Sequence, residues 1–316
     1  GYHPIVLRYI LKRLLHGLIT VWFIATATFI AMHAVPGDPL SGEKAMTPEI
    51  RRNLEAKYGL DKPVVEQYRI FLVNMAKGDF GISYTQQNRE VNDIIREGFP
   101  VSATLGILAV VFAALGGILL GALTATYRNR LPDVVIMFLV ILGISVPSFV
   151  FAALGQLALV KINSWTGFTL FPVAGWGTVM HMVVPSLVLG LGTMAYLTRL
   201  MRSSMLEVTN TDYVRTARSK GLPPARIFLK HQLRNAILPV VTVLGPAIAA
   251  ITTGGFVVEL VFAIPGLGRY FVQAVQQLDY TVIMGTTVFY GAFLVLMVIV
   301  VDIVYGLIDP RVRLKA

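Results

Sequence analysis

Apolar and polar segments alternate along the chain in a pattern typical of membrane proteins. The apolar runs cover about residues 14–35, 101–126, 134–160, 182–201, 237–258 and 281–308. Each can cross a hydrocarbon core of about 30 Å, which needs roughly 20 helical residues. Pro147, Pro185 and Pro246 lie inside three of the runs and are expected to kink or locally unwind them. The pattern predicts an all-α membrane protein with six transmembrane helices.

A polar insert of mixed charge separates the first two runs. It begins at Pro36-Gly37-Asp38-Pro39, a stretch that cannot continue a helix. Thr47 followed by Pro48 predicts a helix start, Gly59 its end, and a second helix is expected over Val64–Lys77. Because sixty-odd residues rarely hold a large core of their own, we expect the insert to pack on the membrane body.

Composition agrees with this reading and excludes thiol chemistry. The chain is 55% hydrophobic and 14% charged, with a mean hydropathy of +0.70. Soluble domains are nearer about 45–50% apolar and about 25% charged. There is no cysteine, so the chain can form neither a disulfide nor a thiolate metal site, and it has no cysteine nucleophile.

The net charge of +10 is distributed very unevenly between the two sides of the predicted bundle. The N-terminus, the 127–133 loop, residues 199–234 and the C-terminal tail together hold sixteen Lys and Arg against four acids. The insert and the other loops are close to neutral. The positive-inside rule therefore places both termini in the cytoplasm and the insert outside. It also explains the positive charge without a nucleic-acid partner.

These signals divide the chain into three parts. Residues 1–35 form the cytoplasmic N-terminus and first transmembrane helix, and residues 36–100 the extracytoplasmic insert. Residues 101–316 form a core of five transmembrane helices, which includes a cytoplasmic loop at 202–236. A short amphipathic or re-entrant element is expected on the outer side over residues 259–280.

The sequence offers no catalytic or metal-binding constellation. Its five histidines are scattered over different segments without metal-ligand spacing, and no Ser/His/Asp grouping is supported. Asp302 is the one acid inside an apolar run, and we interpret it as a candidate intramembrane polar contact rather than an ion-coupling group. A membrane pathway without an internal energy source is either a passive channel or is driven by a partner.

The segment Asp212–Pro239 is the place where such a partner would bind. Asp212 can cap a short helix that ends at Gly221, and Pro223-Pro224 redirect the chain into a second basic, amphipathic segment. The result is an exposed helix–turn–helix on the cytoplasmic side.

Several motifs along the chain resemble those of one family, the permease subunits of ABC importers. The basic segment is similar to their EAA loop, and more narrowly to that of the B-type subunit of the dipeptide/oligopeptide branch. Matching motifs outside that segment are Arg8-Tyr9-Ile10, Pro36-Gly37-Asp38-Pro39, Tyr58-Gly59-Leu60-Asp61-Lys62-Pro63, Gly78-Asp79-Phe80-Gly81, Pro265-Gly266-Leu267-Gly268 and Asp309-Pro310-Arg311. Arg215-Thr216-Ala217 replaces the family's Glu-Ala-Ala triplet, so no role of that Glu is transferred to this chain.

The resemblance implies a type I importer permease that works by alternating access. It implies a second, C-type permease subunit, two cytoplasmic ABC ATPases, an extracytoplasmic peptide-binding protein and membrane lipid as partners. ATP and Mg would be used by the ATPases, so this chain would bind no cofactor and would not be an enzyme. The membrane would be the cytoplasmic membrane of a bacterium or archaeon. The ATPase-coupling residues would be Asp212, Tyr213, Arg215, Thr216, Ala217, Arg218, Lys220 and Gly221.

In that role the basic side chains would meet acidic or carbonyl groups of the ATPase, and the small Ala217 would permit its close approach. Three alternatives remain open at this point. Related permeases import other solutes, such as nickel or glutathione. A self-sufficient channel or secondary carrier would transport without ATPases, and a membrane scaffold would not transport at all.

Overall fold

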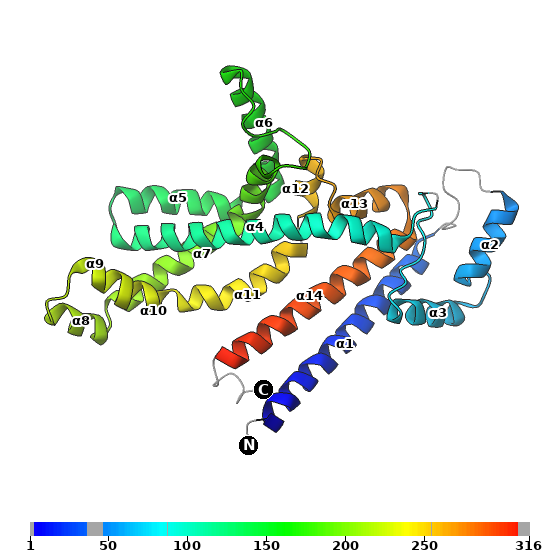
Figure 1. Cartoon of the computed structure of the whole chain (residues 1–316), viewed down its shortest axis with the longest axis horizontal. Coiled ribbons are helices and arrows are strands. Elements are labelled where there is room, and N and C mark those ends of the chain that lie inside the picture. Colours follow the sequence, from blue (N-terminus) through cyan, green and yellow to red (C-terminus); the bar gives the residue numbers. More distant parts are fainter. Residues whose placement is uncertain (1–2, 37–46, 87, 254, 309–316) are drawn as a thin grey trace. The chain divides into compact units, whose positions relative to one another are not determined.

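The computed structural model describes residues 3–36, 47–86, 88–253 and 255–308, and within these ranges the regular structure is helical (Figure 1). An isolated antiparallel bridge joins Ile82 and Glu90. The chain divides into two compact units, one up to Ser102 together with the part from Pro265 on, the other Ala103–Ile264. Each unit is described by itself.

The first unit contains the helices of both chain ends and of the insert. They are α1 (His3–Ala34), α2 (Pro48–Tyr58), α3 (Val64–Ala76), the beginning of α4 (Val91–Thr126), α13 (Leu267–Gln277) and α14 (Tyr280–Ile308).

The second unit contains the rest of α4 and the middle of the chain. Its helices are α5 (Leu131–Ser145), α6 (Ser148–Thr166), α7 (Val179–Thr209), α8 (Asp212–Ser219), α9 (Pro224–Arg226), the π-helix η1 (Ile227–Leu233), α10 (Arg234–Ala236), α11 (Leu238–Thr253) and α12 (Phe256–Val261).

The described helices include five that are long and apolar enough to cross a membrane, α1, α4, α6, α7 and α14. A sixth span results if Pro224–Ala236 and Leu238–Ile251, which meet at a 45° bend, count as one. The predicted all-α membrane architecture is therefore confirmed, with five or six spans.

Two predicted runs have different boundaries in the structure. The run over 134–160 is two helices, because Val146 is extended and Pro147 cannot continue α5. The next span, expected from residue 101, begins already at Val91, and Pro100 lies inside it. The last ten residues assigned to the insert are thus the first turns of α4. Pro185 and Pro246 lie within α7 and α11.

In the first unit, α1 and α14 lie side by side (Figure 1). Residue 17 faces residue 299 and residue 24 faces residue 291, so the two helices run antiparallel. A Cβ added to Gly17 would lie 2.5 Å from the Ile299 Cδ1, and one added to Gly291 would lie 2.9 Å from the Ile24 Cδ1. Glycine at these two positions permits the close helix contact.

The insert packs on this helix pair, as the sequence predicted. The Thr47 side chain caps α2 by accepting a bond from the Ile50 N–H at 3.4 Å, and Gly59 ends the helix with a φ of 66°. Phe71 of α3 is buried in a cluster with Phe29 of α1 and Val288 of α14. The hydroxyls of Thr26 and Tyr68 lie 2.6 Å apart.

In the second unit, α7 packs against α4, α5, α6 and α11. Gly117 and Gly121 of α4 leave room for Leu197 and Met201 of α7, whose Cβ atoms lie about 2.5 and 2.4 Å from where a glycine Cβ would be. Leu197, Met201 and Met205 share one buried cluster with Val240 of α11. This packing supports the end of α7, from which the basic segment continues.

Candidate functional site

The predicted helix–turn–helix is present, and α8 is its first arm. Thr211 is the N-cap by backbone conformation, although its hydroxyl donates to the Val208 carbonyl at 2.6 Å instead of capping the helix. Asp212, expected as the cap, is the first helical residue, and its side chain is fully exposed. A carboxylate in the first turn of a helix is favourable because it faces the positive end of the helix dipole.

The turn after α8 depends on the backbone of Gly221. Its φ is 72°, a conformation that side chains with a Cβ rarely adopt, and its N–H donates to the Arg218 carbonyl at 3.0 Å. No atom lies within 4 Å of the position that a Cβ would take, so the conformation rather than space requires glycine. Pro223 then precedes α9, whose first residue is Pro224.

A small apolar core holds the two arms together. Val214 and Ala217 of α8 and Ile227 of η1 are buried against one another, with Val208 and Leu222 packed around them. This corrects the expectation that the small Ala217 faces a partner. Ala217 is 3% exposed and contacts its own chain, so its size serves the packing of the loop.

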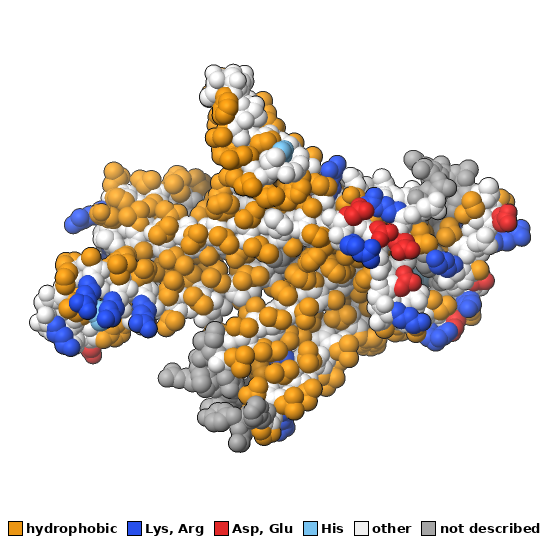
Figure 2. Space-filling view, in the orientation of Figure 1, with side chains coloured by type: hydrophobic (Ala, Val, Ile, Leu, Met, Phe, Trp, Pro, Cys, Tyr) orange, Lys and Arg blue, Asp and Glu red, His pale blue; other side chains and the backbone are white. Residues whose placement is uncertain are grey.

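The other predicted residues of α8, with its C-cap Lys220, form an exposed face that carries positive charge. Tyr213 is 42% exposed, and the Arg215 guanidinium lies 3.9 Å from the Asp212 carboxylate. Thr216, Arg218 and Lys220 are also exposed. Figure 2 shows Lys and Arg side chains gathered at the α8–α10 end of the second unit. Such a face suits an acidic or carbonyl-rich partner surface.

The second arm is a π-helix followed by α10, and it is fixed to α7. The Ser204 hydroxyl donates to the Ala236 carbonyl at 2.7 Å, and both residues are buried. Arg226, Lys230 and Arg234 are exposed along this arm. π-Helical segments are rare and occur frequently at functional sites.

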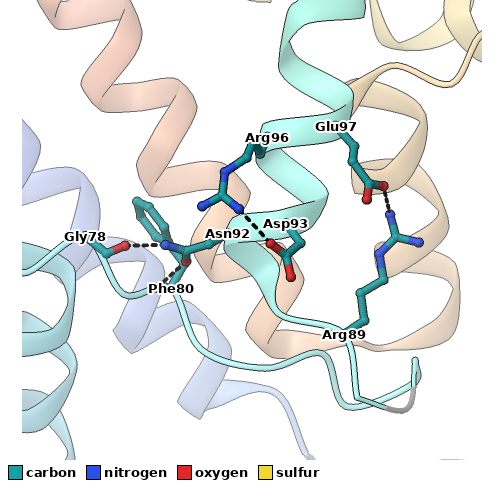
Figure 3. A network of polar contacts seen from close by, with 7 residues as sticks. All are labelled: Gly78, Phe80, Arg89, Asn92, Asp93, Arg96 and Glu97. Atoms are coloured by element: carbon teal, nitrogen blue, oxygen red, sulfur yellow. Dashed lines mark hydrogen bonds and ion pairs between the residues drawn. The ribbon is translucent and has the colours of Figure 1, made fainter.

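Within the insert and the first turns of α4, a network of polar contacts fixes the chain between α3 and α4 (Figure 3). The Asn92 amide of α4 donates to the Gly78 carbonyl at 2.6 Å, and its oxygen accepts from the Phe80 N–H at 2.9 Å. Arg89 pairs with Glu97, and Arg96 pairs with Asp93 at 2.9 Å. The motif Gly78-Asp79-Phe80-Gly81 therefore lies in a turn that the first helical residues of α4 hold in place.

Asp279 organises the same loop from its other end. Its carboxylate is 1% exposed and accepts bonds from the Ser83 hydroxyl, the Tyr84 N–H at 3.0 Å, the Thr85 N–H at 3.3 Å and the Thr85 hydroxyl at 2.8 Å. Burial raises the pKa of the Tyr84 phenol, and the neighbouring carboxylate raises it further. The sequence reasoning missed Asp279, although an acid directly before an apolar run was a visible signal.

The stretch 259–280, expected to be a short amphipathic or re-entrant element, contains the end of α12 and all of α13. In α13, Leu267, Gly268 and Ala274 are buried, and the Leu267 N–H donates to the Ser102 hydroxyl at 2.9 Å. The Arg89 guanidinium lies 5.2 Å from the centre of the Tyr270 ring, a cation–π distance.

Asp302 has a partner on α1. Its carboxylate lies 3.0 Å from the Arg13 guanidinium, and its backbone carbonyl accepts a bond from the Tyr9 hydroxyl at 3.4 Å. No group of three His, Asp or Glu side chains that could hold a metal ion occurs among the described residues.

Comparisons with known proteins cover nearly the whole chain. The family "Binding-protein-dependent transport system inner membrane component" matches residues 117–314, and the corresponding N-terminal family matches residues 6–106. The dipeptide transport system permease protein DppB of Bacillus subtilis is 46% identical over 307 residues, 97% of this chain and 98% of that protein. The oligopeptide transport system permease protein OppB of Haemophilus influenzae is 42% identical, over 98% of this chain and 100% of that protein.

A solved structure of the MetNI methionine ABC transporter in an inward-facing conformation is similar in fold. Its TM-score is 0.52 at 17% sequence identity, over 69% of this chain and 96% of that one. This likeness concerns the fold alone.

Proposed function

Because the chain belongs to the family of inner membrane components of binding-protein-dependent transport systems, we propose that it is the B-type permease subunit of an ATP-driven peptide importer. It is a transport component rather than an enzyme, and it crosses the membrane several times. The main support for a peptide substrate is the 46% identity to a dipeptide permease, over nearly the full length of both chains. The 42% identity to an oligopeptide permease supports the same substrate class.

The proposed complex contains four kinds of protein. This chain and a homologous C-type permease line the pathway, two ABC ATPases bind on the cytoplasmic side, and a peptide-binding protein delivers the substrate outside. ATP and Mg are used by the ATPases. The distribution of Lys and Arg supports a cytoplasmic location of both termini, in the cytoplasmic membrane of a bacterium or archaeon.

In this proposal the coupling loop, residues 202–236, transmits the movement of the ATPases. The exposed side chains of α8 and of its C-cap bind the ATPase: Asp212, Tyr213, Arg215, Thr216, Arg218 and Lys220. The buried contact of Val214 and Ala217 with Ile227 makes the two arms move together. Gly221 sets the angle between them. ATP-driven closure of the ATPase pair opens the pathway outward, and hydrolysis restores the inward-facing state.

The test is uptake into proteoliposomes. The complete complex is expected to take up a labelled dipeptide only with internal ATP and external binding protein, whereas this chain alone should take up none. Transport by the chain alone would replace the proposal with a channel or secondary carrier. Uptake of nickel or glutathione instead of the peptide would keep the machinery and correct its substrate, and a complex that moves none of these solutes would indicate a scaffold.

Variants of the coupling loop test its role. Asp212→Arg changes a fully exposed side chain and is expected to abolish uptake and co-purification of the ATPases. Gly221→Pro should have the same effect, because proline cannot adopt a φ of 72° and lacks the N–H that binds Arg218. The matched control is Asp61→Arg in the exposed part of the insert. Normal uptake by Asp212→Arg would contradict the proposed role.

A further inference from the structure

A partly buried ion pair joins the beginning of α5 to the end of α7. The Arg202 Nε lies 2.9 Å from the Asp133 Oδ1, and its Nη2 lies 2.9 Å from the Oδ2. The Asn129 N–H donates to the same Oδ2 at 2.9 Å. Asp133 is only 4% exposed, although it lies beside a chain reversal.

The two parallel bonds fix orientation as well as distance. A guanidinium paired with a carboxylate in this way resists rotation about the contact, which a single bond does not. The Asp212–Arg215 pair of α8 differs in both respects, because its atoms are 3.9 Å apart and its side chains are exposed. The Asp133–Arg202 pair is thus built as a rigid connection.

Its position in the chain gives this connection a specific use. Arg202 lies in a short stretch of α7, residues 201–205, that is fixed on two sides. Arg202 holds α5, while Ser204 binds the Ala236 carbonyl and Met205 packs in the cluster that contains Ala236. The chain runs from this stretch to α8 and contacts it again at Ala236 of α10.

We infer that the Asp133–Arg202 pair is a positioning contact that makes α5 move as one body with α7 and the coupling loop when ATP drives the transporter. The inference rests on the proposed function. Neither residue touches the ATPase or the substrate in this account. The pair acts by holding α5 against α7, so that movement at α8 reaches α5 as well as α7.

A purely structural role would have a different consequence. If the pair only stabilised the fold, its loss would reduce the amount of assembled complex, and the remaining complexes would transport normally per ATP hydrolysed. Loss of a transmitting contact leaves hydrolysis in place and reduces the transport that accompanies it. The ratio of ATP hydrolysed to peptide transported separates the two roles.

The first experiment measures this ratio in the reconstituted complex for Asp133→Asn and Arg202→Lys. Arg202→Lys keeps the positive charge but cannot make the two parallel bonds to the Asp133 carboxylate. It therefore remains informative if Asp133→Asn assembles poorly. We expect the ratio to rise about tenfold, within the usual range of coupling between sites. The matched control is Asp93→Asn, which removes an exposed Asp–Arg pair of the same 2.9 Å length and should leave the ratio unchanged.

The second experiment follows the helices directly. The chain has no cysteine, so Leu131→Cys on α5 and Ser219→Cys on α8, both exposed, place two spin labels in complexes with cysteine-free partner subunits. With Arg202 present, the distance between the labels should remain the same with and without ATP. In Arg202→Lys the distribution of distances between the two labels should broaden, and its mean should shift, when ATP is added.

An unchanged label distance in Arg202→Lys together with an unchanged hydrolysis ratio would overturn the inference. The proposed function would survive that result, because it depends on ATP-driven uptake by the complex with Arg202 intact. Conversely, a complex that shows no ATP-driven uptake before any substitution contradicts the proposed function itself.

Discussion

At the scale of single residues, Asp279 shows how one carboxylate can order a whole loop. It accepts bonds from the Ser83 and Thr85 hydroxyls and from the Tyr84 and Thr85 N–H groups, donors that lie about 195 positions away in sequence. Hydrogen bonds to a charged group each contribute about 1.5–3 kcal/mol. This one side chain therefore accepts more of the hydrogen bonds of residues 83–85 than any other group that contacts them, beside the Arg89 carbonyl and the Gln277 side chain.

Asp279→Asn is expected to loosen that loop selectively. The amide offers one acceptor oxygen where the carboxylate offers two, and its NH2 group points at donors. Hydrogen exchange at the Tyr84 and Thr85 amides should become at least about tenfold faster, since each 1.4 kcal/mol of lost protection corresponds to a factor of ten. Asp61→Asn, which changes an exposed acid between α2 and α3, serves as the control. Unchanged exchange at both amides would contradict the expectation.

The sequence predicted residues of the coupling loop more successfully than it predicted their contacts. The positive φ of Gly221 and the exposure of Arg215 and Arg218 follow from local rules of helix ends and charge. The burial of Ala217 does not, because it depends on Ile227 folding back over α8. The partners in the Asp133–Arg202 pair are 69 positions apart, so no local pattern joins them.

At the scale of elements, the α1–α14 pair depends on two glycines. Gly291→Leu places a branched side chain where a Cβ alone would lie within 3.0 Å of Ile24. Overpacking of this kind costs about 1–3 kcal/mol. We expect a lower Tm of the detergent-purified complex and no loss of helicity by circular dichroism.

Val298→Leu is the control for this substitution, because Val298 is 41% exposed on the same helix. Its effect should stay within about 0.5 kcal/mol, as is usual for surface changes. Equal Tm values for the two variants would show that the glycine contact does not limit the packing of α1 and α14.

Element boundaries were the least predictable part of the fold. Hydropathy correctly located the apolar runs, but it depends only on the residue types in a window and does not detect where the backbone leaves the helical conformation. It therefore joined α5 and α6 across Val146 and Pro147 and began α4 at the apolar residues rather than at Val91. The polar first turns of α4, which carry Asn92, Asp93 and Arg96, are helical without being apolar.

At the scale of the whole molecule, the uneven distribution of positive charge predicts which loops face which side. A cysteine at Asn88, which is exposed between α3 and α4, should react in intact cells with a thiol reagent that does not cross the membrane. A cysteine at Ser219 of α8 should react only after the membrane is permeabilised. The absence of native cysteine makes each label unique to its site in this chain.

The opposite labelling pattern would show that the topology is the reverse of the predicted one and that residues 202–236 do not lie in the cytoplasm. Labelling of both sites in intact cells would show that one of them lies in a part of the chain whose side was wrongly assigned. The measurement is independent of substrate, so it tests the orientation apart from the peptide proposal.

The π-helical turn at Ile227–Leu233 has a consequence for building chimeras. A π-helix holds an extra residue in each turn, whereas one residue of a regular α-helix corresponds to a rotation of about 100°. A graft that exchanged only residues 212–221 would leave this turn intact. One that cut inside 227–233 and lost the extra residue would rotate Ala236, which binds Ser204, relative to Ile227, which packs on Val214 and Ala217. The natural unit of exchange is therefore the complete stretch from Arg202 to Ile237, whose two ends are already joined through Ser204 and Ala236.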